Sequence, residues 1–146
     1  MSELSPEEQS QLRELIQRSD LAGIQFHELS AKLHSNVKAV DPDVPEEADV
    51  TLRYQTRAGE NLFGVRAQVE LTSASGEAKA VVAAEYELNS GLTPAPELLE
   101  LFATEVGMMT LFPYLREGIS SATSRVFGRP VLLPVLQRGQ IRSNDE

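Results

Sequence analysis

The sequence contains no cysteine and only two histidines, and it has no run of 18 apolar residues. Without cysteine, the chain can form neither disulfides nor thiolate nucleophiles. Its first ten residues, MSELSPEEQS, are acidic and polar, which predicts neither a signal peptide nor a membrane anchor. We therefore expect no stable membrane insertion and a cytoplasmic location.

Sequence motifs typical of catalysis are also missing. His27 and His34 lie seven residues apart, with no cysteine to complete a metal site. The hydroxyl residues at 120, 121, 123 and 124 have no Gly-x-Ser-x-Gly context, and no phosphate-binding or dinucleotide-binding motif occurs. Glu85 and Glu87 lie two residues apart and so face the same side of a strand. A solvated strand face explains this carboxylate pair better than a catalytic one. We expect no enzyme activity, catalytic residue, metal or cofactor.

Acidic side chains outnumber basic ones by 22 to 13, which gives a formal net charge of −9. Such a charge opposes binding to nucleic acids and favours solubility or basic partners. The charge is uneven, because residues 113–142 carry five basic side chains and one acidic side chain. This basic part is compatible with contact to the acidic body of a sister subunit and equally with solvated surface arginines.

A chain of 146 residues with 41% hydrophobic content is expected to form one domain over 1–146. Ser5, Pro6 and the acidic residues after them mark a helix start. Apolar residues at 12, 15 and 16 then form a narrow stripe. This pattern predicts a short N-terminal helix over 6–19.

Residues 24–90 contain four segments in which apolar residues alternate with a period of two. The first segment begins at Ile24 and slips in phase at Glu28 and Leu29, which predicts a bulge. The acidic connector DPDVPEEAD follows, and the turns TRAGEN and TSASGE separate the other segments. We predict a four-stranded antiparallel meander with one polar face.

From residue 96 the apolar period becomes helical. Pro96 and Pro113 each predict a helix start, and Gly128 followed by Pro130 predicts an end near residue 127. We expect two helices within 96–127 packed on the sheet, which makes an α+β fold. An apolar return over 128–142 and a polar tail over 143–146 complete the domain.

The second predicted helix has an unusually small surface. Gly118, Ser121 and Arg125 form one row beside an apolar row that contains Ala122. Glycine inside a helix costs about 1 kcal/mol relative to alanine, so close packing must offset that cost. The packing partner is either the sheet or an equivalent helix of another subunit.

The stretch LFPYLREGISSATSRVFGRPVLLPV, residues 111–135, resembles the SecB export chaperones. That family has a Leu-Phe-Pro-Tyr-x-Arg-Glu run at the start of its long helix, matched here by residues 111–117. A Ser-Arg near the helix end is matched by Ser124 with Arg125. The family's later apolar stretch, which ends in Leu-x-Pro-Val, corresponds to residues 133–135. IQFHEL at 24–29 is similar to the family's Ile-x-Phe-Glu strand.

The resemblance implies an ATP-independent holdase that binds unfolded or pre-secretory polypeptides in apolar grooves. It also implies a homotetramer, a dimer of dimers whose long helices meet, with Gly118, Ser121, Ala122 and Arg125 at the interface. Large apolar residues near the segments that form the groove in the family are our candidates for client binding. They are Phe26, Phe63, Phe102, Met108, Met109, Phe112, Tyr114, Leu132 and Leu136.

In the export chaperones, acidic side chains around the Ile-x-Phe segment help to dock the SecA motor. This chain has Gly23 and His27 at those positions, and Glu85 is the candidate for a further docking glutamate. Divergent relatives of this type include chaperones that guard an aggregation-prone antitoxin, so SecA and an antitoxin are both candidate partners. The alternative is a small α+β ligand-binding protein or enzyme with a pocket between sheet and helices.

Overall fold

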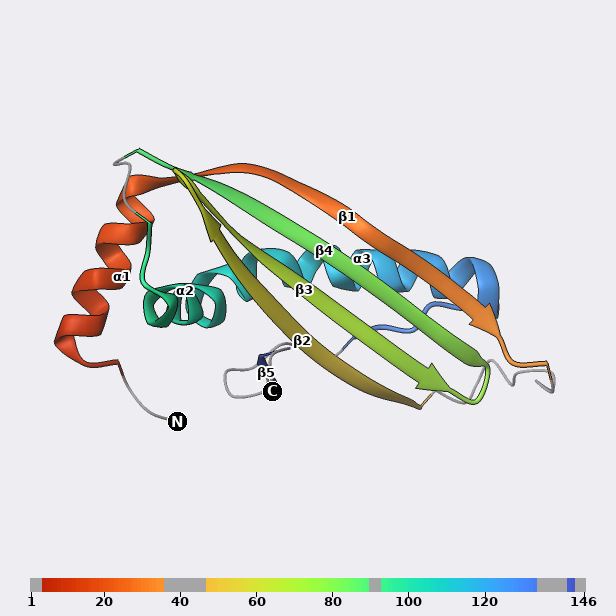
Figure 1. Cartoon of the computed structure of the whole chain (residues 1–146). Coiled ribbons are helices and arrows are strands. Elements are labelled where there is room, and N and C mark those ends of the chain that lie inside the picture. Colours follow the sequence, from red (N-terminus) through yellow and green to blue (C-terminus); the bar gives the residue numbers. More distant parts are fainter. Residues whose placement is uncertain (1–3, 36–46, 90–92, 134–141, 144–146) are drawn as a thin grey trace.

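The computed structural model describes residues 4–35, 47–89, 93–133 and 142–143 (Figure 1). Helix α1 covers Pro6–Arg18 and begins with a capping box. The amide of Glu8 donates to Ser5 Oγ at 3.1 Å, and the amide of Ser5 donates to Glu8 Oε1 at 3.0 Å. Leu12 and Leu15 are the buried residues of α1, which packs against α2 at one end of the sheet.

The sheet contains the predicted antiparallel strands, β1 (Ser19–Leu33), β2 (Ala48–Gly59), β3 (Leu62–Ser73) and β4 (Gly76–Leu88). A two-residue strand, β5 (Arg142–Ser143), adds to β2 in parallel, and the order is β1-β4-β3-β2-β5. The meander prediction is therefore wrong for β1, which pairs with β4. Tight turns join β2 to β3 and β3 to β4, whereas β1 and β2 are consecutive in the sequence but are separated in the sheet by β4 and β3. The four long strands form a Greek key.

Strand β1 contains two register shifts, between Leu21 and Gly23 and between Phe26 and Glu28. The second confirms the bulge predicted from the phase slip at Glu28 and Leu29. Each bulge resets the alternation, so that the apolar residues of β1 stay opposite buried residues of β4. Four such cross-strand pairs are Leu21 with Tyr86, Ile24 with Ala84, Phe26 with Val82 and Leu29 with Ala80.

The helical layer is continuous from α2 (Pro96–Phe102) through a π-helical turn, η1 (Ala103–Gly107), to α3 (Met108–Phe127). The predicted second helix start at Pro113 is wrong, because Pro113 lies inside α3 on its exposed side. The change of direction falls at η1, and α2 is seen nearly end-on in Figure 1 whereas α3 runs along the sheet. A π-turn bends a helix by inserting one residue into the hydrogen-bond ladder.

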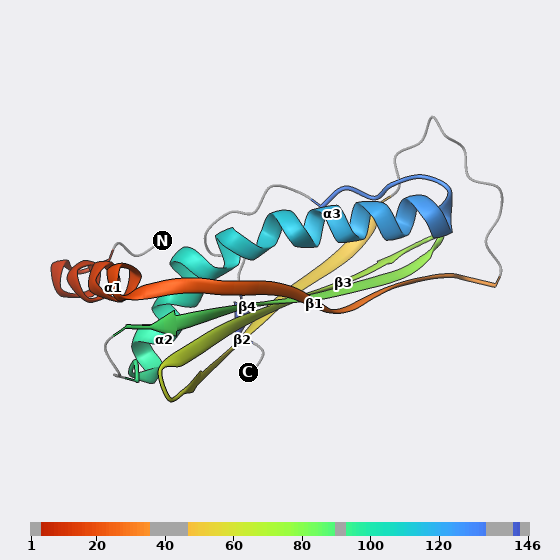
Figure 2. The same cartoon turned by 90° about the horizontal axis from the view of Figure 1, so that it is seen from above.

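The core lies between one face of the sheet and the helical layer (Figure 2). It includes an aromatic cluster in which Phe63 stacks on Tyr86 and Phe102 meets both rings edge-on, with centroids 4.9 to 5.0 Å apart. The run Pro96–Phe127 is long and apolar enough to cross a membrane by length and composition. Its buried side chains pack on the sheet, so core formation accounts for part of that apolar character.

A buried threonine fixes the chain after α3. The helix ends at Gly128, whose φ of 86° is left-handed. The amide of Val131 donates to Thr123 Oγ1 at 2.8 Å, and that hydroxyl donates to the carbonyl of Ile119 at 2.6 Å. Residues 128–133 therefore turn back along α3. Residues 134–141 of the predicted apolar return lie outside the described residues.

Candidate functional site

Helix α3 has a buried face and two flanks with different surroundings. It packs mainly over β4, β1 and β3, which leaves β2 beyond one flank. Helical spacing places Tyr114, Gly118 and Arg125 on the flank toward β1. The same spacing places Met109 and Phe112 on the flank of Thr123, where the returning segment is bound. Figures 1 and 2 both place this returning segment on the side of α3 away from β1.

On the first flank, α3 has a notch that is filled by its own sheet. A Cβ atom at Gly118 would lie 2.8 Å from Phe26 Cε1 and 3.3 Å from Leu29 Cδ1. The small side chain at 118 therefore admits the ring of Phe26. This is one of the two packing partners that the sequence left open, and it replaces the assignment of Gly118 to a helix contact between subunits.

The other residues assigned to the subunit interface have some exposure. Ser121 and Ala122 are half-buried and Arg125 is exposed. The edge strand β1 adds a row of exposed apolar residues on the same side of the sheet as α3. We call this row the β1 strip, and it consists of Leu21, Phe26, Leu29 and Leu33.

On the second flank, large apolar side chains reach solvent. Leu132 is 66% exposed, Met109 is 41% exposed and Phe112 is half-buried. Val50 of β2 is also exposed on the helix side of the sheet. We call Val50, Met109, Phe112 and Leu132 the β2-side surface.

The candidate client-binding residues thus fall into three groups. Phe63, Phe102 and Met108 are at most 1% exposed, so they belong to the core and offer no surface to a client. Phe26 and Tyr114 lie on the β1 flank, and Met109, Phe112 and Leu132 lie on the β2 side. Leu136 lies outside the described residues.

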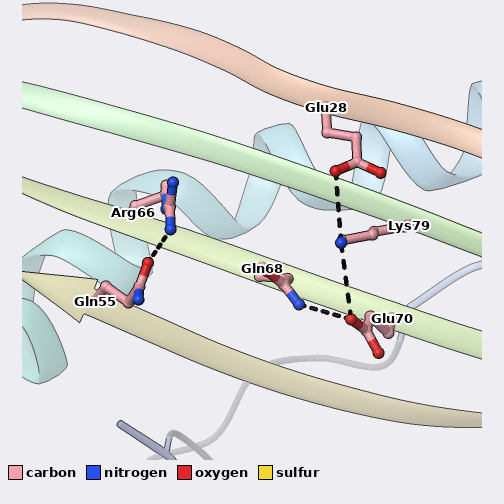
Figure 3. A network of polar contacts seen from close by, with 6 residues as sticks. All are labelled: Glu28, Gln55, Arg66, Gln68, Glu70 and Lys79. Carbon is pink, nitrogen blue, oxygen red and sulfur yellow. Dashed lines mark hydrogen bonds and ion pairs between the residues drawn. The ribbon is translucent and has the colours of Figure 1, made fainter. Parts of the chain in front are cut away.

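The face of the sheet opposite the helices is polar. Lys79 Nζ lies 3.4 Å from Glu28 Oε1 and 4.0 Å from Glu70 Oε1, and Gln68 Nε2 donates to Glu70 at 2.7 Å (Figure 3). Arg66 donates to Gln55 beside this cluster. These exposed groups satisfy one another in solvent, where such pairs contribute little to stability.

A hollow of about 640 Å³ lies on the same polar face. Gly23, His27 and Glu85, the positions compared with motor docking in the export chaperones, all line it. Glu85 Oε1 lies 3.7 Å from an exposed Arg57 nitrogen, and Arg66 also borders the hollow. The hollow is thus bordered by charges of both signs.

The described residues offer no arrangement for metal binding, because no cluster of three His, Cys, Asp or Glu side chains occurs among them. The hydroxyls of Thr104, Thr110 and Thr123 bond to helix carbonyls one turn earlier. Burial raises the pKa of the Tyr86 hydroxyl more than a contact with Thr110 lowers it. The phenol is therefore protonated at neutral pH, within an apolar cluster.

Sequence reasoning missed most of the β1 strip and Val50. The alternation in β1 carried a signal, since each phase slip keeps an apolar residue on one face. This row is exposed because β1 is an edge strand. The position of β1 depends on the strand order, which periodicity does not encode.

No family model matches this chain. It is 31% identical over 132 residues to the SecB-like chaperone SmegB of Mycolicibacterium smegmatis, and the alignment covers 90% of this chain and 84% of that protein. The fold is similar to that of the SecB-like chaperone Rv1957 of Mycobacterium tuberculosis, solved in complex with a ChAD peptide from the HigA1 antitoxin. The TM-score is 0.75 at 24% identity, over 88% of this chain and 98% of that one.

The fold comparison agrees with the predicted α+β class, and the sequence comparison confirms the resemblance drawn from residues 111–135. A relative more than 30% identical, matched over most of both chains, establishes the family. This chain belongs to the SecB-like chaperones.

Proposed function

We propose that this chaperone is an ATP-independent holdase that keeps an antitoxin soluble, and that it acts in the cytoplasm as a homotetramer. An antitoxin client is supported by the Mycobacterium tuberculosis relative, whose structure contains an antitoxin peptide. The apolar β1 strip supports assembly, because an edge strand with exposed apolar side chains is a ready contact for a second copy.

The β2-side surface carries the proposal for client binding. Met109 is a flexible apolar side chain and Leu132 is a highly exposed one. Both belong to a chain with a net charge of −9. Such a surface gains free energy from any apolar segment, at roughly 25 cal/mol per Å² buried, with little dependence on client sequence. Methionine suits varied partners because its side chain is flexible and polarizable. The net charge of −9 keeps the free chaperone soluble.

The test is suppression of aggregation by a chemically unfolded antitoxin without ATP. Met109→Ser with Leu132→Ser should weaken binding by about 1 to 2 kcal/mol, close to tenfold, because two buried apolar contacts are lost. Aggregation followed by light scattering against chaperone concentration gives the apparent affinity. Ile16→Ser is the matched control, since Ile16 is similarly exposed on α1, and it should leave the curve unchanged.

If Ile16→Ser lowered the apparent affinity for the antitoxin equally, the effect would come from general surface polarity. The β2-side surface would then not be the client site. A wild-type chain that fails to slow aggregation would contradict the holdase itself. Pull-down of purified SecA should be weak in the same preparation. Gly23 and His27 stand where the export chaperones have acidic docking groups, and Arg57 and Arg66 border that hollow.

A further inference from the structure

Within the described residues, only the short strand β5 pairs with the outer edge of β2. Strand β2 is 12 residues long, and the two residues of β5 pair with it at Arg53 and Tyr54. Within the part of the chain that the structure describes, no other strand pairs with this edge. Among the described residues, the backbone groups of β2 on either side of Arg53 and Tyr54 have no neighbouring strand on this edge.

The edge of β2 is regular and well supported. Its register with β3 is unbroken from Ala48 to Gly59, whereas β1, at the other edge, is interrupted by two bulges. The hydroxyl of Tyr54 donates to Glu100, which ties the strand to α2. Bulges bend a strand and break its ladder, so β2 is the better template for an added strand.

The two sides of β2 specify the chemistry of such a strand. Val50 and Leu52 pair with buried residues of β3 and so lie on the helix side. Arg53 and Arg57 are exposed, and they pair with residues of the polar face. Arg57 has one ion pair, at 3.7 Å with Glu85, and both side chains are about half-exposed or more. An added strand would set apolar side chains beside Val50 and carboxylates beside the two arginines.

We propose that the outer edge of β2 is a strand-addition site for an extended client segment in which apolar residues alternate with acidic ones. Residues 142–143 then occupy the centre of this edge until a client displaces them. The inference rests on the proposed function, because it describes how a client is bound next to the β2-side surface. Backbone hydrogen bonds supply affinity without regard to sequence, and the alternation supplies selectivity.

The probe is a fluorescein-labelled octapeptide of alternating valine and glutamate, measured by anisotropy against the full chain. Arg142→Pro with Ser143→Pro removes two amides that could pair with β2. The variant should bind about three- to tenfold more tightly than the wild type. In the wild type, only the fraction of molecules in which β5 has left the edge of β2 can bind the peptide. A valine and lysine octapeptide should bind several-fold more weakly than the glutamate one.

A second measurement uses the wild-type chain and peptides N-methylated at every second residue. In a strand, alternate amides face the same edge, so at least one of the two methylated sets should lose binding. Binding of both methylated sets at full affinity overturns strand addition, and so does equal affinity of the wild type and the double proline variant. A concentration-dependent rise in mass of the proline variant without peptide binding would assign the edge to a second copy and overturn the client as occupant.

The outcome is separable from that of the proposed function. If aggregation of the antitoxin is suppressed while both methylated peptides bind fully, only the binding mode is wrong. If the octapeptide binds as described while aggregation is not suppressed, the edge is a peptide site and the holdase proposal fails.

Discussion

At the scale of single residues, Gly118 and Phe26 share one space. The ring of Phe26 lies where a side chain at 118 would begin, and it is still 36% exposed. A residue of β1 is therefore positioned by the absence of a side chain on α3. The exposed part of that ring belongs to the β1 strip. A change in the packing at Gly118 would therefore also change the surface of the β1 strip.

Gly118→Leu should destabilise the protomer by about 1 to 3 kcal/mol, because an overpacked site forces the ring of Phe26 outward. Adding Phe26→Ala should recover part of that loss, since the double variant has room for leucine. Urea unfolding of the two single variants and the double variant gives the coupling free energy. Strictly additive effects would show that the residues do not share a site.

The sequence predicted the close approach at Gly118 but not its partner. A row of small residues requires a nearby backbone or ring, and it does not say which element supplies one. Met108 and Met109 illustrate the same limit in reverse. Successive positions on a helix differ by about 100°, so one methionine of this pair is buried and the other is exposed. The prediction that both methionines bind clients is therefore wrong for Met108, which is buried.

At the scale of elements, the bend between α2 and α3 depends on close packing at Gly107. A Cβ atom there would lie 2.9 Å from Val65 Cγ2 and 3.1 Å from Val65 Cγ1. A stiff β-branched side chain in a strand has little freedom to move aside. The π-turn η1 therefore brings the helix against β3 at the one position where a glycine allows it.

Gly107→Ala should destabilise the chain by about 1 to 2 kcal/mol, although alanine gains nearly 1 kcal/mol in helix propensity over glycine. Ser124→Ala is the matched control, because it makes a similar helix-favouring change at an exposed site of α3, and it should be neutral or slightly stabilising. Thermal unfolding compares the two. If Gly107→Ala raised the melting temperature, the contact with Val65 would not limit the approach of the helix.

Local sequence signals predict most of the helices and strands, but they do not predict which distant segments pair with one another. The capping residues of α1, the two-residue alternation and the glycine after α3 are properties of adjacent positions. The pairing of β1 with β4 joins segments that are far apart in the sequence, and no local pattern contains that contact. Pro113 has the typical character of a helix start, and here it is accommodated on the exposed side of a long helix.

At the scale of the whole molecule, an acidic body presents apolar side chains at both sides of one helix. The β1 strip lies along an open sheet edge, and the β2-side surface lies beside the returning segment. The two surfaces face different sides of α3, so assembly through one leaves the other accessible. A chaperone that assembles and binds clients at once needs this separation.

The division of roles predicts which substitutions change the mass of the particle. Leu29 is 45% exposed in the protomer, so Leu29→Glu should leave folding nearly intact while it places a charge in the proposed contact between copies. We expect the wild type at about four times 16.0 kDa and the variant at a lower mass in light scattering coupled to size exclusion. Leu132→Glu is the control and should keep the wild-type mass while it weakens client binding. If Leu29→Glu kept the mass and Leu132→Glu lowered it, the two surfaces would have exchanged roles, with copies of the chain meeting on the β2 side.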